Sequence, residues 1–350
     1  MYQTADGVRF RVEVVARNLE IPWSLAFAPD GRLLFTERPG RVRVIENGRL
    51  REQPLAAIPD VLHRGEGGLM GLALDPAFAQ NHTLYFCYTY RNSAGGTSNR
   101  VVRYHEEAGR LVQPKTLVDN IPGAFFHNGC RLRFGPDGKL YVTTGDATEG
   151  RIAQDLNSLG GKILRINGDG NIPSDNPFPN SPVFSYGHRN SQGIDWHPTA
   201  GLLFETEHGP SGFDAPGGGD EVNIVEAGKN YGWPVIHHRD RRAGMESPLL
   251  EYTPAIAPSG AMFYRGTRFR AFKNNFFFAT LRGEHLHRVV LDPADLRKVR
   301  TEERLLEEVY GRIRDLVEGP DGDLYFCTSN RDGRASPAPE DERILRILPQ

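Results

Sequence analysis

One unit recurs along the whole chain: a turn followed by a short apolar strand. It is clearest in the segments PDGRLLFTE, PDGKLYVTTGD and PDGDLYFCTSN, and further copies read NHTLYFCYTY, TAGLLFETE and KNNFFFATLRG. The copies can be anchored at six positions: Leu33, Leu84, Leu140, Leu202, Phe276 and Leu324. The anchors are 51, 56, 62, 74 and 48 residues apart. The residues after the last anchor and those up to the first anchor together make a sixth interval of 59 residues. Repeats of this length with Asp-Gly turns are typical of propeller blades of about four strands each.

Six such units use all 350 residues without remainder. The sequence therefore predicts an all-β fold, a six-bladed β-propeller with four-stranded antiparallel blades, as a single domain over residues 1–350. Further strands fit between the anchors, at 41–48, 100–107, 162–167, 285–291 and 343–348. The last of these is expected to pair with the N-terminal strand VRFRVEVVA, which would close the ring and remove open sheet edges. Only short helices are expected, such as one over 301–309.

Charge and hydropathy narrow the class of partner. The net charge of −2 gives no basic footprint, so neither nucleic acid nor an anionic membrane surface is indicated. No apolar run approaches the ~20 residues that span a bilayer. The opening MYQTADGVRF has neither a basic region nor an apolar core of the kind found in export signals.

The three cysteines are too few for a disulfide framework, and their spacing matches no zinc signature. Cys87 and Cys327 lie within apolar strands, which favours buried thiols over a bridge. One pair could still oxidise and leave one thiol over.

The stretch 183–234 combines several polar groups in loops. Arg189 and Asn190 follow a short apolar run and offer several fixed donors to an anionic, oxygen-rich ligand. Gly209 and Pro210 could offer backbone carbonyls to a hard cation. Glu221 and the Tyr231 carbonyl could hold another cation. The alternative for Glu221 is a solvated loop carboxylate.

His127 lies at a loop-to-strand junction in GAFFHNGCRLRFGPDG, in front of a blade anchor. A neutral imidazole is a natural base for taking a proton from a hydroxyl, although a structural histidine is the simpler interpretation of any single histidine. Arg312 and Arg314 stand before the last anchor, and two guanidiniums on one strand face suit a ligand with several carboxylates. A chance surface pair is the alternative for them, and a turn residue is the alternative for Glu66, in GEGGLMGLALDP.

With these residues laid out, the chain resembles the soluble PQQ-dependent sugar dehydrogenases, in particular the aldose sugar dehydrogenase branch. The most specific pieces are GHRNSQGI, EHGP with GGDEVNIV and GKNYGWP, GEGGLMGLALDP, and HNGCRLRFGPDGKLY. Their order along six blades carries the resemblance, which covers nearly the whole length.

The resemblance implies pyrroloquinoline quinone (PQQ) and calcium as cofactors, aldose sugars oxidised at C1 to lactones, and electrons passed to an external acceptor. It implies His127 as general base, with Arg189 and Asn190 at the cofactor and the reacting centre. The remaining cofactor contacts that it implies are Glu66, Arg282, Arg312 and Arg314. Gly209 and Pro210 would bind a calcium ion at the quinone, and Glu221 and Tyr231 a second, structural one. It also implies a periplasmic or extracellular location.

Two departures and two rival functions accompany this interpretation. Glu66 stands where the glucose dehydrogenases have Gln, and Phe126 precedes the histidine where they have Asp, so a preference for glucose does not follow. Arg282 stands where the family has a cofactor-binding Lys, and that exchange is not automatically conservative. A non-catalytic interaction propeller is one alternative, and a calcium-dependent lactonase-type hydrolase is the other, because fold alone does not fix function.

Overall fold

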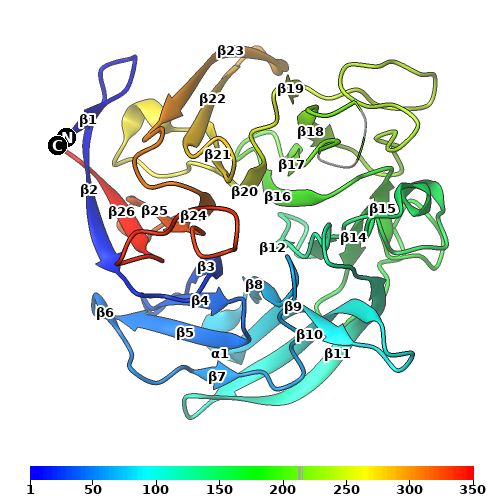
Figure 1. Ribbon diagram of the computed structural model, residues 1–350, viewed down its shortest axis with the longest axis horizontal. Helices are drawn as coiled ribbons and strands as arrows, with labels where there is room; N and C mark the ends of the chain where they lie inside the picture. The colour runs from blue at the N-terminus through cyan, green and yellow to red at the C-terminus, as the bar shows by residue number, and fades with distance from the viewer. Residues whose placement is uncertain (212–213, 215) are drawn as a thin grey trace.

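The computed structural model describes residues 1–211, 214 and 216–350, and these form six antiparallel sheets arranged around a central axis (Figure 1). The expected six-bladed β-propeller is confirmed. The inner strand of each blade lines the axis, and these strands are β3 (Pro22–Phe27), β8 (Leu69–Leu74), β12 (Leu132–Phe134), β16 (Ser191–Trp196), β20 (Pro258–Phe263) and β24 (Ile313–Glu318).

The second strand of each blade is the repeated apolar strand of the sequence. These strands are β4 (Leu33–Glu37), β9 (Thr83–Arg91), β13 (Leu140–Thr143), β17 (Leu203–Glu207), β21 (Phe276–Thr280) and β25 (Leu324–Thr328). Five of the six anchors lie in them, and Leu202 immediately precedes β17. The third strands are β5 (Arg41–Glu46), β10 (Thr97–Glu107), β14 (Lys162–Ile166), β18 (Asp220–Val225), β22 (Leu286–Asp292) and β26 (Ile344–Pro349).

The outer strands are more variable in length, since one of their edges faces solvent. They are β6 (Arg49–Leu50) with β7 (Ala56–Ala57), β11 (Arg110–Pro122), β15 (Val183–Tyr186), β19 (Leu250–Tyr252), β23 (Asp295–Leu305) and β2 (Arg9–Ala16) with β1 (Tyr2–Gln3). In the last blade β2 pairs with β26, from Phe10 opposite Pro349 to Ala16 opposite Ile344. The two ends of the chain therefore belong to one sheet, and Figure 1 shows them side by side.

The apolar core is divided into six clusters among the described residues, one between each pair of adjacent blades. Each cluster combines alternate residues of two sheets, as period-two strands require. Between blades two and three, for example, Cys87 and Val101 pack with Val142 and Leu164. Because the second strands are buried on both faces, they read as the continuous apolar runs that reveal the repeat.

Two expectations are wrong. Residues 301–309 do not form a helix, because most of that segment belongs to β23, which pairs along β22 and buries little of its own surface. The short helices are instead α1 (Phe78–Asn81) and the 3₁₀ turns η1 (Gly150–Gln154) and η2 (Arg270–Phe272). Cys87 is not a free thiol, since it forms a disulfide with Cys130, and Cys327 is the buried free cysteine.

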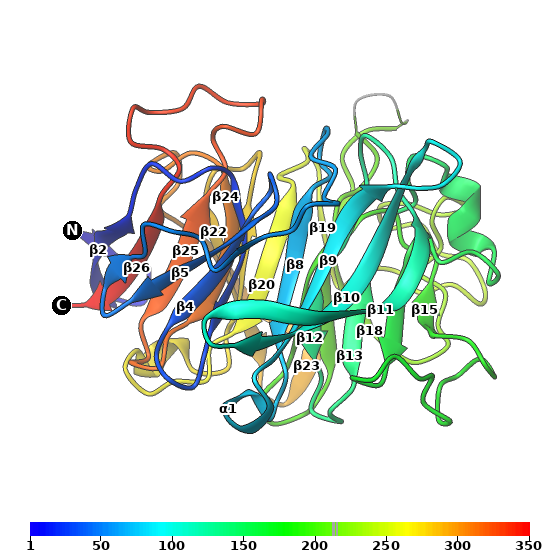
Figure 2. The same ribbon diagram turned by 90° about the horizontal axis from the view of Figure 1, so that it is seen from below.

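The two faces of the ring carry different connections. In Figure 2 the loop after β25 rises above the upper face, and α1, which follows β8, lies at the lower face. Every inner strand starts at the upper face, so the loops before inner strands and those after second strands gather there. No helix among the described residues has the length and apolar character needed to cross a membrane.

Candidate functional site

The upper face holds a cavity of about 500 Å³. Loops that precede inner strands contribute Glu66, His127, Arg189 and Arg312 to its wall, and loops that follow second strands contribute His208, Arg282 and Arg334. The structure thus brings five of the predicted site residues (Glu66, His127, Arg189, Arg282 and Arg312) to one hollow, from five different blades.

The imidazole of His127 is buried and held by a carboxylate. Its Nδ1 lies 2.8 Å from Oδ1 of Asp146, in the loop after β13. Asp146 also accepts hydrogen bonds from Nε1 of Trp233 and from the backbone N–H of Thr148, both at 2.8 Å. Because a carboxylate acceptor engages Nδ1–H, the neutral ring carries its lone pair on Nε2. The arrangement is that of a base with its orienting acid.

Glu66 joins the backbone of His127 to the rim of the cavity. Its Oε2 accepts from the His127 N–H at 3.0 Å, and its Oε1 accepts from Nη1 of Arg334 at 2.7 Å. Burial raises the pKa of Glu66, but Arg334, His208 and the His127 N–H together outweigh it, and the pKa is lowered to about 2. Glu66 is therefore an anion at neutral pH and an acceptor only.

Arg189 is almost completely buried in the cavity wall. Its Nη1 donates to the carbonyl of His208 at 3.1 Å, its Nε and Nη2 donate to Asp214, and its guanidinium lies over the Trp233 ring. Asn190 accepts at Oδ1 from the Gly129 N–H at 3.1 Å. A backbone hydrogen bond from Asp146 to Arg189 connects the loops of blades three and four, and one from His208 to Asn190 connects two loops of blade four.

Arg312 and Arg314 lie at different depths. Arg312 donates from Nε and Nη2 to Asp332, at 3.0 and 2.8 Å. Arg314 lines a narrow hollow next to the main cavity, with Trp23, and donates from Nη1 to Oε1 of Gln192 at 3.1 Å. Burial, together with the nearby Arg38 and Arg312, lowers the pKa of Arg314 to about 9. Crowded cations of this kind favour an anionic ligand.

Three buried polar atoms around this hollow have no hydrogen-bond partner among the residues that the structure describes. They are Nδ2 of Asn190, Nε2 of His208 and Nε of Arg314. Burial and the neighbouring Arg314 and Arg189 lower the pKa of His208 to about 3, so this ring is neutral. Unsatisfied buried polar groups are costly, and a ligand rich in oxygen would satisfy them. The narrow hollow itself, of about 10 Å³, has room for about one water. The adjoining cavity of about 500 Å³, with its four guanidiniums, fits a planar polycarboxylate such as PQQ.

Gly209 and Pro210 follow β17 between His208 and Ser211, which both line the cavity. The Gly209 N–H donates to Oδ1 of Asp220 at 2.8 Å, and a Cβ at this position would lie 2.0 Å from the Gly219 carbonyl oxygen, so only glycine fits. Neither carbonyl accepts a hydrogen bond from another described residue. Both are therefore available to a cation.

Glu221 lies away from the cavity in a second polar cluster. It is the cross-strand neighbour of Glu207, and Asn223 donates to both Glu221 and Glu205, at 3.0 and 3.1 Å. Ligand atoms of His188, Glu205 and Glu207 all lie within 4.8 Å of one another. We call His188, Glu205, Glu207 and Glu221 the acidic cluster.

The carboxylates of the acidic cluster share one imidazolium: burial lowers the pKa of His188, but Glu205 and Glu207 outweigh it and raise that pKa to about 9. Burial and the adjacent Glu205 raise the pKa of Glu207 to about 7, and burial and Glu207 raise the pKa of Glu221 well above its usual range. The Tyr231 ring stacks on His188 with centroids 4.8 Å apart. Carboxylates packed in this way fit a divalent cation.

Several of these residues were not identified from the sequence. Asp146 lies six residues after its anchor Leu140, as Asn330 does after Leu324, at the polar ends of TTGD and CTSN, and both are buried. That shared polar ending after an apolar strand is the signal that could have found Asp146, whereas Glu207 is the last residue of β17 itself. His208, Arg334 and Asp332 lie in loops whose sequences carry no such pattern.

The family model for glucose/sorbosone dehydrogenases matches residues 19–345. Aldose sugar dehydrogenase YliI of Escherichia coli is 34% identical over 345 residues, which cover 92% of this chain and 91% of that protein. Quinoprotein glucose dehydrogenase B of Acinetobacter calcoaceticus is 30% identical over 67% of this chain and 54% of that protein. The PQQ-bound aldose sugar dehydrogenase of Streptomyces coelicolor superposes with a TM-score of 0.86 at 36% identity, covering 98% of this chain and 99% of that one.

Proposed function

Because the chain belongs to the glucose/sorbosone dehydrogenase family, we propose that it oxidises aldose sugars at C1 to lactones with PQQ and calcium. The electrons pass to an external acceptor. The observation that carries the proposal is the His127–Asp146 pair at the wall of a cavity that also contains Arg189, Arg282 and Arg312. A base and several cations at one hollow are what the oxidation of an alcohol by an anionic cofactor needs.

The oxidation removes a hydride from C1 and a proton from the anomeric hydroxyl. Bound PQQ supplies the two-electron acceptor. His127 takes the proton at Nε2, and Asp146 stabilises the imidazolium that forms. Arg189 steadies the oxygen as negative charge develops on it. The C1–O bond becomes the carbonyl of the lactone.

The residues assigned to the cofactor hold its carboxylates and carbonyls. Arg312 and Arg314 bind carboxylates, since guanidinium–carboxylate pairs can be bidentate. At about 4 Å and an effective dielectric of 20, each such pair contributes at most ~4 kcal/mol before desolvation. Arg282, Arg189 and Asn190 provide the remaining donors, and Glu66, which only accepts, would contact an N–H group of the cofactor. Arg312 already pairs with Asp332, so the cofactor must share or displace that carboxylate.

Two calcium sites complete the proposal. One uses the carbonyls of Gly209 and Pro210 beside the cavity. The other uses Glu221 and the carbonyl of Tyr231, where the acidic cluster supplies the negative charge that attracts the ion.

We place the protein in the periplasm or outside the cell. The disulfide between Cys87 and Cys130 supports this location, because such bonds persist mainly in oxidising compartments.

The cavity lining argues against a metal-dependent lactonase. Such a hydrolase needs carboxylates and amides that converge on one ion in the central channel. The described lining of the upper cavity contains four guanidiniums (Arg189, Arg282, Arg312 and Arg334) and two carboxylates (Glu66 and Asp220). This balance favours an anionic cofactor over a cation at the axis.

Reconstitution tests the function. Purified protein is incubated with PQQ and calcium, and dye reduction is followed with a panel of aldoses while NMR identifies the product. Sugar-dependent dye reduction with lactone formation supports the proposal. Saturable binding of PQQ without reduction by any aldose would indicate the non-catalytic propeller instead.

A further inference from the structure

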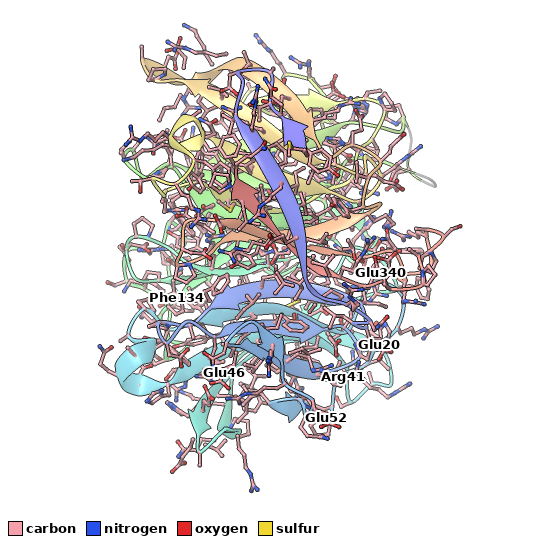
Figure 3. The ribbon with its side chains drawn as sticks, turned by 90° about the vertical axis from the view of Figure 1, so that its left-hand side faces the viewer. Glu20, Arg41, Glu46, Glu52, Phe134 and Glu340 are labelled. Atoms are coloured by element: carbon pink, nitrogen blue, oxygen red, sulfur yellow. A yellow bond between two sulfur atoms is a disulfide. The ribbon has the colours of Figure 1, made fainter. Side chains whose placement is uncertain are left out.

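A second cavity, of about 590 Å³, opens on the lower face at the other mouth of the central channel. Its wall is built from the C-terminal halves and following turns of the inner strands β3, β8, β12, β20 and β24. Figure 3 labels Phe134, which lines this cavity, and Glu340, which lies in the loop after β25. The two residues lie toward opposite faces of the ring. Its volume is within the range of small-molecule sites.

Three guanidiniums line this cavity from its depth to its mouth. Arg131 and Arg133 are two residues apart and therefore share one side of the chain at β12, and Arg265 lies at the lip. Arg131 is 4% exposed, and the side chains of Arg133 and Arg265 are 33% and 43% exposed. Desolvation and the neighbouring Arg265 and Arg131 lower the pKa of Arg133, although the nearby Asp195 opposes that shift.

The carboxylates of this face are already engaged. Asp195 accepts from Nη1 and Nη2 of Arg265 and from the Phe263 N–H. Oδ2 of Asp315 accepts from the Leu25 N–H at 2.8 Å and pairs with Arg131 at 3.1 Å. Glu318 accepts from the Arg265 N–H at 2.7 Å.

Two guanidinium nitrogens at this cavity still lack a hydrogen-bond acceptor among the described residues. Arg133 pairs through Nε with Asp195 at 3.2 Å and donates from Nη1 to the Ala261 carbonyl at 3.2 Å. Its Nη2 has no hydrogen-bond partner among the described residues, and neither has the buried Nη2 of Arg131. The guanidinium of Arg133 can therefore receive an acceptor from a ligand.

The rest of the wall is apolar and incompletely covered. Phe27, Leu74, Phe134 and Val317 come from the ends of four inner strands and stay half-buried, whereas apolar side chains deeper in the blades are fully enclosed. Two of them are aromatic. Apolar surface that converges on a hollow from four blades suits a hydrophobic ligand body.

We propose that this lower cavity is a binding site for a small amphipathic carboxylate. Its carboxylate pairs with Arg133, and its apolar body lies against Phe27, Phe134 and Val317. This site is separate from the upper cavity. Trp23 lines the upper hollow, Arg131 lines the lower cavity, and the Arg131 guanidinium lies 4.2 Å from the Trp23 ring centroid, so these two side chains stand between the cavities.

Titration calorimetry with 2-naphthoate tests the proposal, with neutral 2-naphthylmethanol as the matched ligand. Saturable binding of the carboxylate is expected, with at least tenfold weaker binding of the alcohol. Arg133→Met should weaken naphthoate binding at least tenfold, because the pairing cation is gone. Val317→Trp should also weaken it at least tenfold, since the indole fills the space without changing a charge.

Arg282→Met is the control, since Arg282 lines only the upper cavity. It should leave the affinity within twofold. Each variant is checked for an unchanged circular dichroism spectrum before titration. The proposal is overturned if naphthoate shows no saturable binding, if the alcohol binds as tightly, if Arg282→Met weakens binding as much as Arg133→Met, or if Arg133→Met and Val317→Trp, both folded, bind as the parent does.

Discussion

Nδ1 of His127 and Oδ1 of Asp146 lie 2.8 Å apart, although the two residues belong to different loops of the third blade. The Ala147 N–H donates to the His127 carbonyl, so the backbones are connected at the same point. Asp146 serves three donors at once: the imidazole, Nε1 of Trp233 and the Thr148 N–H. Asp146 therefore orients the His127 ring, while Glu66 accepts from the His127 backbone N–H.

Replacing either member of this pair should lower turnover with little effect on cofactor binding. His127→Gln should reduce kcat by about 10²- to 10⁴-fold, the usual contribution of a general base. Asp146→Asn should reduce it by about 10²-fold or more, because an amide offers one acceptor oxygen to three donors. Steady-state kinetics of the reconstituted variants and PQQ titration give the two readouts. Trp233→Phe removes one donor only, and an equal loss there would show that Asp146 does not act through His127.

The pH dependence of stability should report the charge of Glu66. Its pKa is lowered from 4.5 to about 2, so its contribution to the free energy of unfolding is present above pH 4.5 and is lost as the pH falls toward 2. The stability difference between the parent protein and Glu66→Gln should therefore shrink by about 1 kcal/mol between pH 6 and pH 3.5, with a discount for the half-exposed Arg334. Urea unfolding at each pH measures the difference. A constant difference would mean that Arg334 does not hold Glu66 ionised.

The disulfide should matter for stability and for the site together. It joins β9 to Cys130, three residues after His127, and closes a loop with a sequence separation of 43. Replacing both cysteines by alanine should lower the free energy of unfolding by about 2–4 kcal/mol and reduce kcat, because the loop that carries His127 loses its covalent link to blade two. Urea unfolding and steady-state assays provide the test. Cys327→Ala is the control, since Cys327 is buried but unbonded to another cysteine, and it should leave kcat unchanged.

The architecture could be predicted from the sequence because the second strand of every blade is buried on both faces. That burial requires an apolar run such as LLF or FFF in each blade, so the period is visible without a structure. The outer strands have one solvent-facing edge. They are more polar, so the sequence does not show them as apolar runs. The sequence around Thr301 and Glu302 predicts a helix when it is considered alone. In the structure this segment pairs with the edge of β22 and is therefore a strand.

The site was only partly predictable, for a geometric reason. Residues that precede inner strands, such as His127 and Arg189, share a recognisable place in each repeat. Arg334 and Asp332 come from the loop after β25. The distance from Arg334 to Glu66, in blade two, depends on the closed ring, whereas Asp332 reaches Arg312 within blade six through the path of that loop. Pairing of Cys87 with Cys130 likewise depends on the packing of blade two against blade three.

Calcium should stabilise the protein through Glu221. A ligand that binds only the folded state adds about 2.7 kcal/mol at a hundredfold excess over its dissociation constant. Glu221→Gln should remove most of the calcium-dependent increase in Tm, and chelation should lower Tm in the parent protein. Glu226→Gln is the control, because that exposed carboxylate pairs with Arg297 away from the acidic cluster. An equal calcium response in Glu221→Gln would exclude Glu221 as a ligand.

Arg312 and Asp332 should affect PQQ binding in opposite directions. Arg312→Met removes a buried cation from the cavity wall, and it should weaken PQQ binding about tenfold or more, as loss of a charge-assisted contact does. Asp332→Asn keeps the shape of the side chain but removes the carboxylate that competes for Nε and Nη2 of Arg312, so binding should become tighter. Equilibrium titration of the apoprotein with PQQ in saturating calcium measures both, and the thermal stability of each variant shows whether it is folded. If Asp332→Asn weakened binding, Asp332 would be a positioning residue for Arg312 and not its competitor, because the guanidinium would then need that carboxylate to face the cavity.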